Sequence, residues 1–354
     1  MFLMPHSSSA PPQRLTLKTV AALAGVSTAT ADRVLNQRPG VRPITVQKVR
    51  QAAQALGYLP DALADAAPQS APWKLAFVLP QGQNPYLRML GDTIGFSESH
   101  QAPFNVKCQV EYVESFNPEA LAATLLRLGK RVQGIAFMAI EHPAVREAVQ
   151  QLAERGVPTL TVISDLDNSA RIAYVGLDNR AAGRTAAYLL ARFIGSQRRD
   201  AQIALIAGSR SYLAHEEREG GFLQLHAEQF PDMQILGLRE SYDDSSRNYQ
   251  QTKELLQRHP HIAGIYNIGG SSDGVGRALQ EAGREHQVVL IGHGLTPDTR
   301  ALLINGTMDA VITQSHLGII MSCIRMFSNL RDQLDTMTAV DIVRSQVIFR
   351  ENLP

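Results

Sequence analysis

The chain has 354 residues, of which 44% are hydrophobic, 19% charged and 6% aromatic. This composition can bury apolar cores and excludes a disordered chain, and at about 150 residues per domain the length predicts two or three domains. Lys+Arg is 34 and Asp+Glu is 33, so a generally basic or acidic protein is excluded. No apolar run approaches the roughly 18 residues of a membrane span, and we expect no membrane contact.

The N-terminal residues and the cysteines indicate a cytoplasmic protein. The opening MFLMPHSSSAPPQ lacks a basic start and an apolar core, so we expect no secretory signal. Cys108 and Cys323 are the only cysteines, and their separation suggests neither a disulfide framework nor a zinc site. We therefore expect no metal and no cofactor.

Charge is divided unevenly along the chain. Residues 1–60 hold seven basic side chains and one acid, Asp32, for a net charge of +6, which leaves −5 for the rest. Such a division predicts a polyanionic partner for the first part, although a solvated basic surface would give the same count.

The N-terminal region is predicted in three parts. Residues 1–13 are Ser/Pro-rich and are expected to be a disordered tail, and residues 60–72 are an Ala/Pro-rich linker. Between them, residues 14–59 have the pattern of a helix–turn–helix with a third, supporting helix. The predicted helices are Leu17–Ala24, Thr28–Leu35 and Val46–Leu56. Their predicted caps are Thr16, Ser27 and Thr45. Gly25 permits the positive φ of the intervening turn, and Gly57 ends the third helix.

From residue 73 onward, short apolar strands alternate with amphipathic helices. The predicted strands are Leu75–Pro80, Cys108–Val113, Gly134–Ile140, Thr159–Ile163, Ala173–Leu177, Gln202–Ala207, Gln234–Leu238, Gly264–Ile268, Val288–Gly292 and Ala310–Thr313. This alternation predicts parallel sheets with helices on both faces. Ten strands exceed what one such domain usually needs, so we expect two doubly wound α/β subdomains.

The run LTLKTVAALAGVSTATADRVLNQRPGVRPITVQKVRQAAQALGYLPDALA resembles the DNA-binding headpiece of the lactose-repressor (LacI/GalR) family of bacterial regulators. The body of the chain is similar to that family's effector domain, which has the fold of periplasmic sugar-binding proteins. The resemblance implies a homodimer that binds a pseudo-palindromic double-stranded DNA operator and a small-molecule effector. It also implies an effector domain over 73–354, which we divide into an N-subdomain (about 73–176 and 297–316) and a C-subdomain (about 177–296 and 317–350).

By this resemblance the second helix lies in the DNA major groove. The residues implied in DNA binding are Ser27, Thr28, Ala29, Thr30, Arg33, Asn36, Arg42 and Thr45. Arg33 matches a base-contacting arginine, which can bond O6 and N7 of guanine together. Ser27 and Thr45 are also explained as simple helix caps, and Arg33 as a solvated arginine. Asp32 departs from the family, where serine is common.

The linker also departs from the family. Many members insert a hinge-helix leucine into the minor groove and kink the DNA. The aligned residue is Ala67, which is too small to act as a wedge. Either Leu63 takes that role or the operator is bent less, and we expect weaker bending.

The effector site is predicted at the carboxyl ends of the strands, where ligands bind in open α/β sheets. The candidate residues are Asn84, Tyr86, Asp165, Asp178, Glu216, Arg218, Gly270, Asp273, His293 and Gln314. Tyr86 could stack on a sugar ring, and Arg218 is the candidate ligand-binding arginine. Asp178 is equally explained as a helix cap. Gly294 stands where sugar-binding relatives usually carry an acid, so the effector could differ from a simple hexose or pentose.

Taken together, the sequence predicts a ligand-responsive transcription regulator, most simply a repressor controlled by a sugar, a polyol or a related metabolite. An enzyme is not expected, because GGSSDGVG fits neither a phosphate loop nor a dinucleotide fingerprint and no G-x-S-x-G occurs. Two alternatives stay open: a regulator controlled by a protein partner, with a degenerate cleft, and a solute-binding protein.

Overall fold

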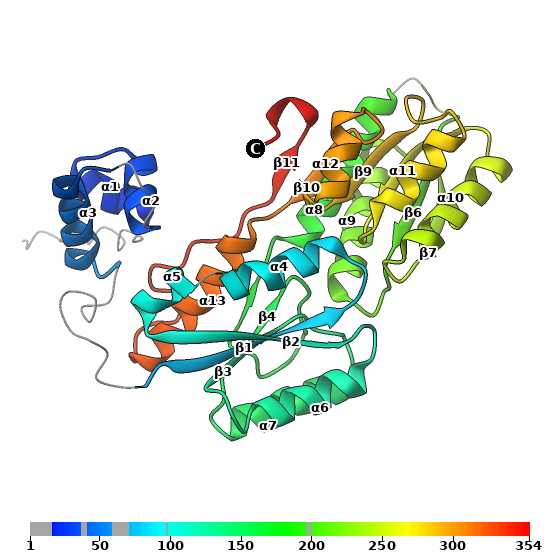
Figure 1. Ribbon diagram of the computed structural model, residues 1–354. Coiled ribbons are helices and arrows are strands. Elements are labelled where there is room, and N and C mark those ends of the chain that lie inside the picture. The colour runs from blue at the N-terminus through cyan, green and yellow to red at the C-terminus, as the bar shows by residue number, and fades with distance from the viewer. Residues whose placement is uncertain (1–15, 37–40, 59–70, 97, 196–197, 199) are drawn as a thin grey trace, which may run out of the picture. The chain divides into compact units, whose positions relative to one another are not determined.

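The structure is a computed structural model that describes residues 16–36, 41–58, 71–96, 98–195, 198 and 200–354 (Figure 1). Backbone contacts divide it into two units, considered separately below: Met1–Ala71 with Arg325–Asp341, and Pro72–Ile324 with Ile342–Pro354. The predicted tail over 1–13, most of the predicted linker and both hinge residues, Leu63 and Ala67, lie outside the described residues.

Three helices form the described headpiece: α1 (Leu17–Ala24), α2 (Thr28–Leu35) and α3 (Pro43–Ala55). The first two have the predicted bounds. Thr16 caps α1 by accepting the Thr19 amide, and the Oγ of Ser27 caps α2 by accepting the Thr30 amide at 3.1 Å. Gly25 joins them with a φ of +65°, a conformation that glycine adopts without strain.

The third headpiece helix begins earlier than predicted. The amides of Thr45 and Val46 donate to the carbonyl oxygen of Arg42 at 2.9 and 3.1 Å, so Arg42 occupies the cap position. A proline suits the first helical position, because the amide proton that it lacks has no partner there. The predicted cap at Thr45 is therefore wrong, and that residue lies inside the first turn of α3.

Small side chains form the headpiece core. Ala21 and Ala31 are 2% and 0% exposed, and they let α1 and α2 cross closely around Val20, Val34 and Val49. Because so small a unit buries little apolar surface, close packing of these alanines matters to its stability.

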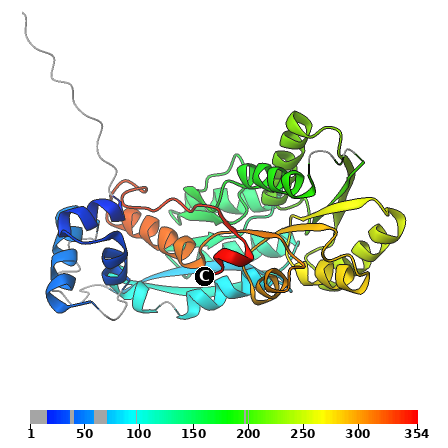
Figure 2. The same cartoon turned by 90° about the horizontal axis from the view of Figure 1, so that it is seen from above.

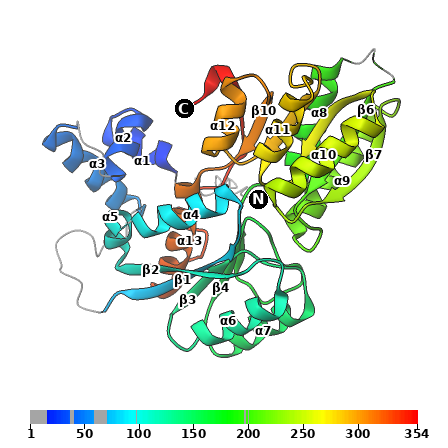
Figure 3. The ribbon, with the colours of Figure 1, turned by 45° about the vertical axis from the view of Figure 1, so that its right-hand side comes forward.

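The first subdomain is a parallel sheet with the strand order β2-β1-β3-β4-β5. Its strands are β1 (Trp73–Gln81), β2 (Val106–Glu114), β3 (Gly134–Phe137), β4 (Thr159–Val162) and β5 (Ala173–Val175). Its helical segments are α4 (Pro85–Phe96), α5 (Glu98–Gln101), η2 (Ala102–Phe104), α6 (Pro118–Leu128) and α7 (Pro143–Glu154). Helices α6 and α7 cover one face of the sheet and α4 covers the other (Figures 1 and 3).

The second subdomain is a sheet with the order β11-β10-β9-β8-β6-β7. Its strands are β6 (Gln202–Ala207), β7 (Gln234–Glu240), β8 (Ile262–Asn267), β9 (Val289–His293), β10 (Ala310–Thr313) and β11 (Gln346–Ile348). Its helical segments are α8 (Asn179–Ile194), α9 (Leu213–Gln229), α10 (Ser245–Arg258), α11 (Ser272–Glu281), α12 (Pro297–Ile304) and η3 (Arg350–Asn352). In the view of Figure 2 the two subdomains lie side by side.

Two apolar cores lie on opposite faces of the second sheet. Successive strand residues point to opposite faces, so Ile265 of β8 joins a core with α11, whereas Tyr266 joins a core with α8 and α9. Burial on both faces gives the nearly continuous apolar runs by which these strands were predicted.

All ten predicted strands are present, with ends shifted by a few residues, and the predicted fold class is confirmed. The strand β11 was not predicted. It is antiparallel to β10, where Ile312 is paired with Val347. Its three residues are too short to give a clear alternating pattern.

The structure differs from the predicted division into subdomains. We expected 297–316 in the first subdomain, but β10 pairs with β9 of the second sheet, and Leu302 of α12 packs in the second subdomain's core. The chain returns to the first subdomain only at α13 (His316–Arg331), where the rings of His316 and Tyr86 lie 4.2 Å apart. The apolar pattern of a strand is the same in either sheet, so it does not reveal such a crossover.

None of the helices in the described part of the chain has both the length and the apolar character needed to cross a bilayer.

Candidate functional site

A cavity lies between the two subdomains, at the carboxyl ends of strands from both sheets. Six of the predicted effector residues line it: Asn84, Tyr86, Arg218, Gly270, His293 and Gln314. The cavity measures about 40 Å³, which is room for about three water molecules. Rearrangement of its walls is therefore needed to admit a molecule as large as a sugar.

Arg218 of α9 is the buried cation of this cavity. Its Nε donates to Oδ1 of Asn179 at 2.8 Å, and its Nη1 donates to the carbonyl oxygen of Ile268 at 2.9 Å. Burial lowers the pKa of the guanidinium, while the nearby Tyr266, Tyr174, Tyr86 and Asp243 act in the opposite direction. Arginine nevertheless stays charged in proteins, so the cavity contains a fixed positive charge.

Two glycines bring α9 close to α8 and so position Arg218. A Cβ on Gly183 would overlap the carbonyl oxygen of Arg218 and lie 2.8 Å from its carbonyl carbon. A Cβ on Gly221 would overlap the carbonyl oxygen of Arg180 and lie 2.9 Å from its carbonyl carbon. Both distances are shorter than an ordinary carbon–carbon contact of about 3.5–4.0 Å, so only glycine fits at either crossing point.

His293, at the end of β9, is fixed by a tyrosine. Its Nε2 lies 2.7 Å from the hydroxyl oxygen of Tyr266, and the two rings are 5.6 Å apart. Burial holds the pKa of His293 well below its ordinary value, helped by the nearby Arg218 and His215, so the imidazole is neutral. Its Nδ1 is buried and has no hydrogen-bond partner among the described residues.

Tyr86 forms one wall of the cavity. Its hydroxyl donates to the carbonyl oxygen of Gln314 at 3.2 Å, its ring packs against His316, and burial raises its pKa. A Cβ on Gly294 would lie 3.0 Å from Cδ2 of Tyr86, and Gly294 has a φ of +78°. The ring of Tyr86 thus explains why glycine, and no acidic residue, stands at this position.

Asp243 and His215 also line the cavity and were not among the predicted site residues. Asp243 follows β7, so the strand-end rule that selected the other candidates would also have found it. One carboxylate oxygen accepts the Gly270 amide at 2.7 Å and the other accepts Nδ2 of Asn84 at 2.9 Å. His215 lies on α9, in the segment that follows β6. Burial lowers its pKa, and Asp243 opposes that effect.

Contacts across the cleft hold the subdomains in a closed arrangement. Besides the Asn84–Asp243 bond, the ring of Phe116 in the first subdomain lies 5.1 Å from Tyr212 and 5.3 Å from Tyr242 in the second. Phe116, Tyr242 and Asp243 all have positive φ values, of +60°, +57° and +54°. Backbone strain of this kind clusters at ligand clamps and switch regions.

The chain crosses between the subdomains three times, after β5, after β10 and between α13 and β11. Gln314 lies in the second crossover, and its Oε1 accepts the amide of Leu177 in the first at 2.9 Å. One side chain thus joins two of the three crossovers and lines the cavity.

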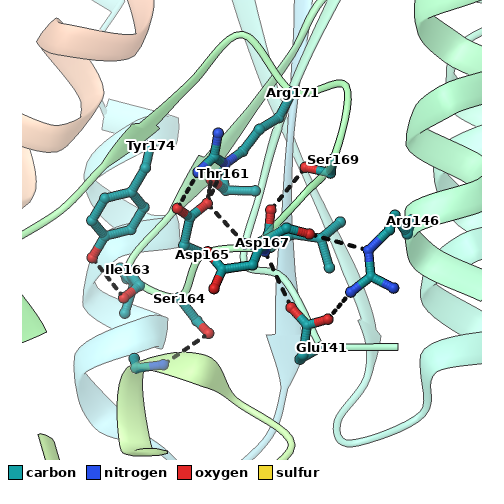
Figure 4. A network of polar contacts seen from close by, with 12 residues as sticks. Glu141, Arg146, Thr161, Ile163, Ser164, Asp165, Asp167, Ser169, Arg171 and Tyr174 are labelled. Atoms are coloured by element: carbon teal, nitrogen blue, oxygen red, sulfur yellow. Dashed lines mark hydrogen bonds and ion pairs between the residues drawn. The ribbon is translucent and has the colours of Figure 1, made fainter. Parts of the chain in front are cut away.

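Four predicted effector residues do not line the cavity. Asp165 is ion-paired with Arg171 and bonded to Thr161 (Figure 4). Burial would raise the pKa of Asp165, but the bonds from Arg171 and Thr161 hold it below its ordinary value.

The other three have structural roles or lie outside the cavity. Asp178 caps α8, where its Oδ1 accepts the Ala181 amide at 2.8 Å. Asp273 accepts a hydrogen bond from the Ser245 hydroxyl, and Glu216 is exposed on α9. Oxygen-rich loops after strands therefore also serve helix capping and ion pairing, which the sequence pattern does not separate from ligand binding.

The headpiece presents part of α2 to solvent. Thr28, Ala29 and Arg33 are exposed, whereas Ala31 and Val34 are buried. An exposed N-terminal half is what a recognition helix needs to reach base edges. Ser27 and Thr30 bond each other, with 2.8 Å between their hydroxyl oxygens.

Asp32, the acid that departs from the family pattern, is held by a neighbour. Its Oδ1 accepts Nδ2 of Asn36 at 2.7 Å. This bond occupies one donor of Asn36, a predicted DNA-binding residue. Of the other predicted DNA contacts, Arg42 is exposed and Thr45 is half-buried.

A search of the described residues for three or more His, Cys, Asp or Glu side chains that could hold a metal ion finds no such group.

Two family models match the chain. The model of bacterial regulatory proteins of the lacI family matches residues 16–61, and that of the periplasmic binding protein domain matches residues 76–333.

Similar proteins include regulators and a sugar-binding protein. The HTH-type transcriptional regulator CelR of Thermobifida fusca is 27% identical over 303 residues, which cover 79% of this chain and 82% of that protein. The HTH-type transcriptional repressor PurR of Vibrio parahaemolyticus is 26% identical over 213 residues, covering 60% and 61%. The crystal structure of GanP, a glucose-galactose binding protein from Geobacillus stearothermophilus, covers 80% of this chain and 100% of GanP, with a TM-score of 0.71 and 21% identity.

Proposed function

We propose, because the chain belongs to the LacI family of bacterial regulatory proteins and carries a periplasmic binding protein domain, that it is a repressor released from its operator by a small polar effector. Family membership makes it a DNA-binding transcriptional regulator and not an enzyme. The finer claims proposed here are the sign of regulation, a sugar or polyol as effector, a homodimer on a pseudo-palindromic operator, and a cytoplasmic location.

The observation that carries the effector proposal is the meeting of six predicted residues at one cavity. Arg218, His293 and Asn84 reach it from different elements and supply polar groups, while Tyr86 supplies an aromatic wall. Pockets of this kind, mostly apolar with a few convergent polar groups, bind small molecules. The fold of sugar-binding proteins such as GanP is consistent with this, although at 21% identity it speaks only for the fold.

The DNA-binding proposal rests on the exposed face of α2. Arg33 is the longest of the exposed candidates there and can bond a guanine with both ends of its guanidinium. A homodimer would place two such helices on two half-sites, which accounts for a pseudo-palindromic operator. We place the protein in the cytoplasm because its DNA target lies there.

Coupling between the two sites requires that the effector bind one subdomain arrangement better than the other. An effector can shift the equilibrium only by that difference in affinity. The contacts of Phe116 with Tyr212 and Tyr242, and of Asn84 with Asp243, form only when the cleft is closed. They are the means by which a bound molecule would favour one arrangement.

The test is a footprinting and gel-shift assay of the full chain on genomic fragments, with a panel of sugars and polyols. We expect protection of one class of pseudo-palindromic site and its loss when an effector is added. Arg33→Ala should weaken specific binding about 10- to 100-fold, as loss of a bidentate guanine contact does, with little change on random DNA. The control is Arg50→Ala, which removes the same charge from the exposed face of α3.

The outcomes separate the alternatives. Equal loss of specific and random binding in Arg33→Ala would mean that Arg33 contacts only phosphate. An operator whose occupancy responds to no metabolite would favour control by a protein partner. Absence of any preferred site, together with tight sugar binding, would favour a solute-binding protein.

A further inference from the structure

The polar groups that line the cavity differ in how well they are paired. Both oxygens of the Asp243 carboxylate accept hydrogen bonds, from the Gly270 amide and from Asn84. Arg218, by contrast, bonds only an amide oxygen and a backbone carbonyl oxygen, both neutral. Within the described part of the chain its Nη2 makes no hydrogen bond.

This pairing distinguishes Arg218 from Arg171 and Arg210 of the second unit. Arg171 is paired with Asp165, and Arg210 with Glu219. Those two arginines are more exposed than Arg218, whose residue is only 6% exposed. A buried charge is costly unless it is both paired and hydrogen-bonded, so the arginine that most needs an anionic partner has no ion pair with a described carboxylate.

His293 supplies a second donor to the same cavity. Tyr266 is fully buried, and among the described residues its hydroxyl bonds only to Nε2 of His293. If Nε2 carried the proton, the phenol's own proton would lack an acceptor, at the cost of a buried unsatisfied donor. The phenol therefore donates to Nε2, and the neutral imidazole carries its proton on Nδ1.

The Nδ1–H of His293 is consequently a donor without a partner. The residue is 9% exposed, and its Nδ1 is buried with no acceptor among the described residues. His293 and Arg218 line the same cavity, and the polar groups that each still has unpaired are N–H donors. A ligand hydroxyl could satisfy one of them, but a group with two acceptor oxygens and a negative charge would satisfy both.

We propose that the effector carries a carboxylate, held between Arg218 and His293, and is a sugar acid in place of a neutral sugar or polyol. This inference rests on the proposed function and names the chemical class of its effector. The guanidinium fork accepts a carboxylate with two parallel N–H···O bonds, and such charge-assisted bonds are roughly twice as strong as neutral ones. The Asp243 carboxylate, each oxygen of which already accepts a hydrogen bond from Gly270 or Asn84, is left to hold the cleft closed.

The test compares acids with uncharged molecules of the same shape. Calorimetric titration of the full chain would use D-glucuronate, D-galacturonate, D-gluconate and D-galactonate. The neutral counterparts of the cyclic uronates are D-glucose, D-galactose and D-glucuronamide, in which an amide replaces the carboxylate. Those of the open-chain aldonates are D-glucitol and D-galactitol. We expect at least one acid to bind at least 10-fold more tightly than its counterpart, and to release the operator in a gel shift.

Variants separate charge recognition from a general loss of folding. Arg218→Gln should abolish the preference for the acid, and His293→Gln should reduce it several-fold. Because Arg218→Gln also removes structural bonds, its folding is checked by circular dichroism, and Arg218→Lys retains the charge without the fork. Arg171→Gln is the matched control, since Arg171 pairs with Asp165 and does not line the cavity, and it should keep the full preference.

The outcomes separate a failure of the carboxylate proposal from a failure of the proposed repressor function. Equal or tighter binding of the neutral counterpart in every pair that binds would overturn the carboxylate and leave the repressor proposal intact. Binding of an acid without any effect on operator occupancy would contradict the proposed function but not the site. If no member of the panel binds, both proposals are contradicted.

Discussion

The close crossing of α8 and α9 makes a sharp prediction about two adjacent glycines. A Cβ on Gly221 would overlap the carbonyl oxygen of Arg180 and lie 2.9 Å from its carbonyl carbon, whereas a Cβ on Gly220 meets nothing within 4 Å. An ordinary carbon–carbon contact is about 3.5–4.0 Å, so Gly221→Ala must push the two helices apart by roughly 1 Å. Both positions lie inside the same helix, so the intrinsic helix preference for alanine is equal.

The magnitude follows from these two effects. Alanine in place of glycine stabilises a helix interior by about 1 kcal/mol, and overpacking a core costs about 1–3 kcal/mol or more. We expect Gly220→Ala to raise the free energy of unfolding by about 0.5–1 kcal/mol. Gly221→Ala should lower it by about 1–2 kcal/mol, because backbone atoms cannot move aside as a flexible side chain can.

Urea denaturation of the two full-length variants beside the unchanged chain measures the difference. Effector titration adds a second measurement, because Arg218 lies one turn from Gly221 on α9 and should be displaced with it. Equal shifts in unfolding free energy for the two variants would refute the close helix crossing and, with it, our account of how Arg218 is positioned.

Three further predictions concern the cavity. Gly294→Ala should cost more unfolding free energy than Gly156→Ala in urea denaturation. Both have positive φ, +78° and +72°, and share about 1–3 kcal/mol of strain, but only the first approaches Tyr86. Burial holds the pKa of His316 at about 4, below its unfolded value of about 6.5. The unfolded state therefore binds more protons between these values, and stability should fall on acidification by about 1.4 kcal/mol per pH unit, with a shallower slope in His316→Gln. Phe116→Ala, which loses two aromatic contacts worth about 0.5–1.5 kcal/mol each, should weaken effector affinity about 10-fold by calorimetry; unchanged affinity would mean that the Phe116 contacts do not favour the bound arrangement.

Periodicity and capping chemistry were sufficient to predict most of the fold. Ser27 and Gly25 have local roles that depend on a few neighbouring residues, so α1 and α2 were predicted to the residue. The start of α3 was misplaced because threonine is a common capping residue and arginine is not, so the sequence favoured Thr45 over Arg42 as the cap. The helix in fact begins at Pro43. The position of β10 in the second sheet depends on contacts distant in sequence, which an apolar run does not encode.

The candidate site was also predictable only where it depends on local sequence signals. Strand ends bring His293 and Gln314 together because parallel strands share one carboxyl edge, and Arg218 reaches the same cavity from α9. Whether a polar residue there faces the cavity depends on its other partners, and Asp165 is taken by Arg171. The explanation for Gly294 required the ring of Tyr86, which is 208 residues earlier in the chain and has no local signature near the glycine.

The position of Gln314 determines how much the ligand contacts would change when the two subdomains rotate. Its side chain joins two of the three chain crossings through Leu177 and also lines the cavity, so the pivot and the binding pocket share a side chain. In a rigid-body rotation, atoms near the axis are displaced little and atoms far from the axis are displaced most. A ligand that contacts Gln314 would therefore keep that contact while the subdomains rotate. The contacts of Phe116 with Tyr212 and Tyr242, which are made across the cleft, would change most.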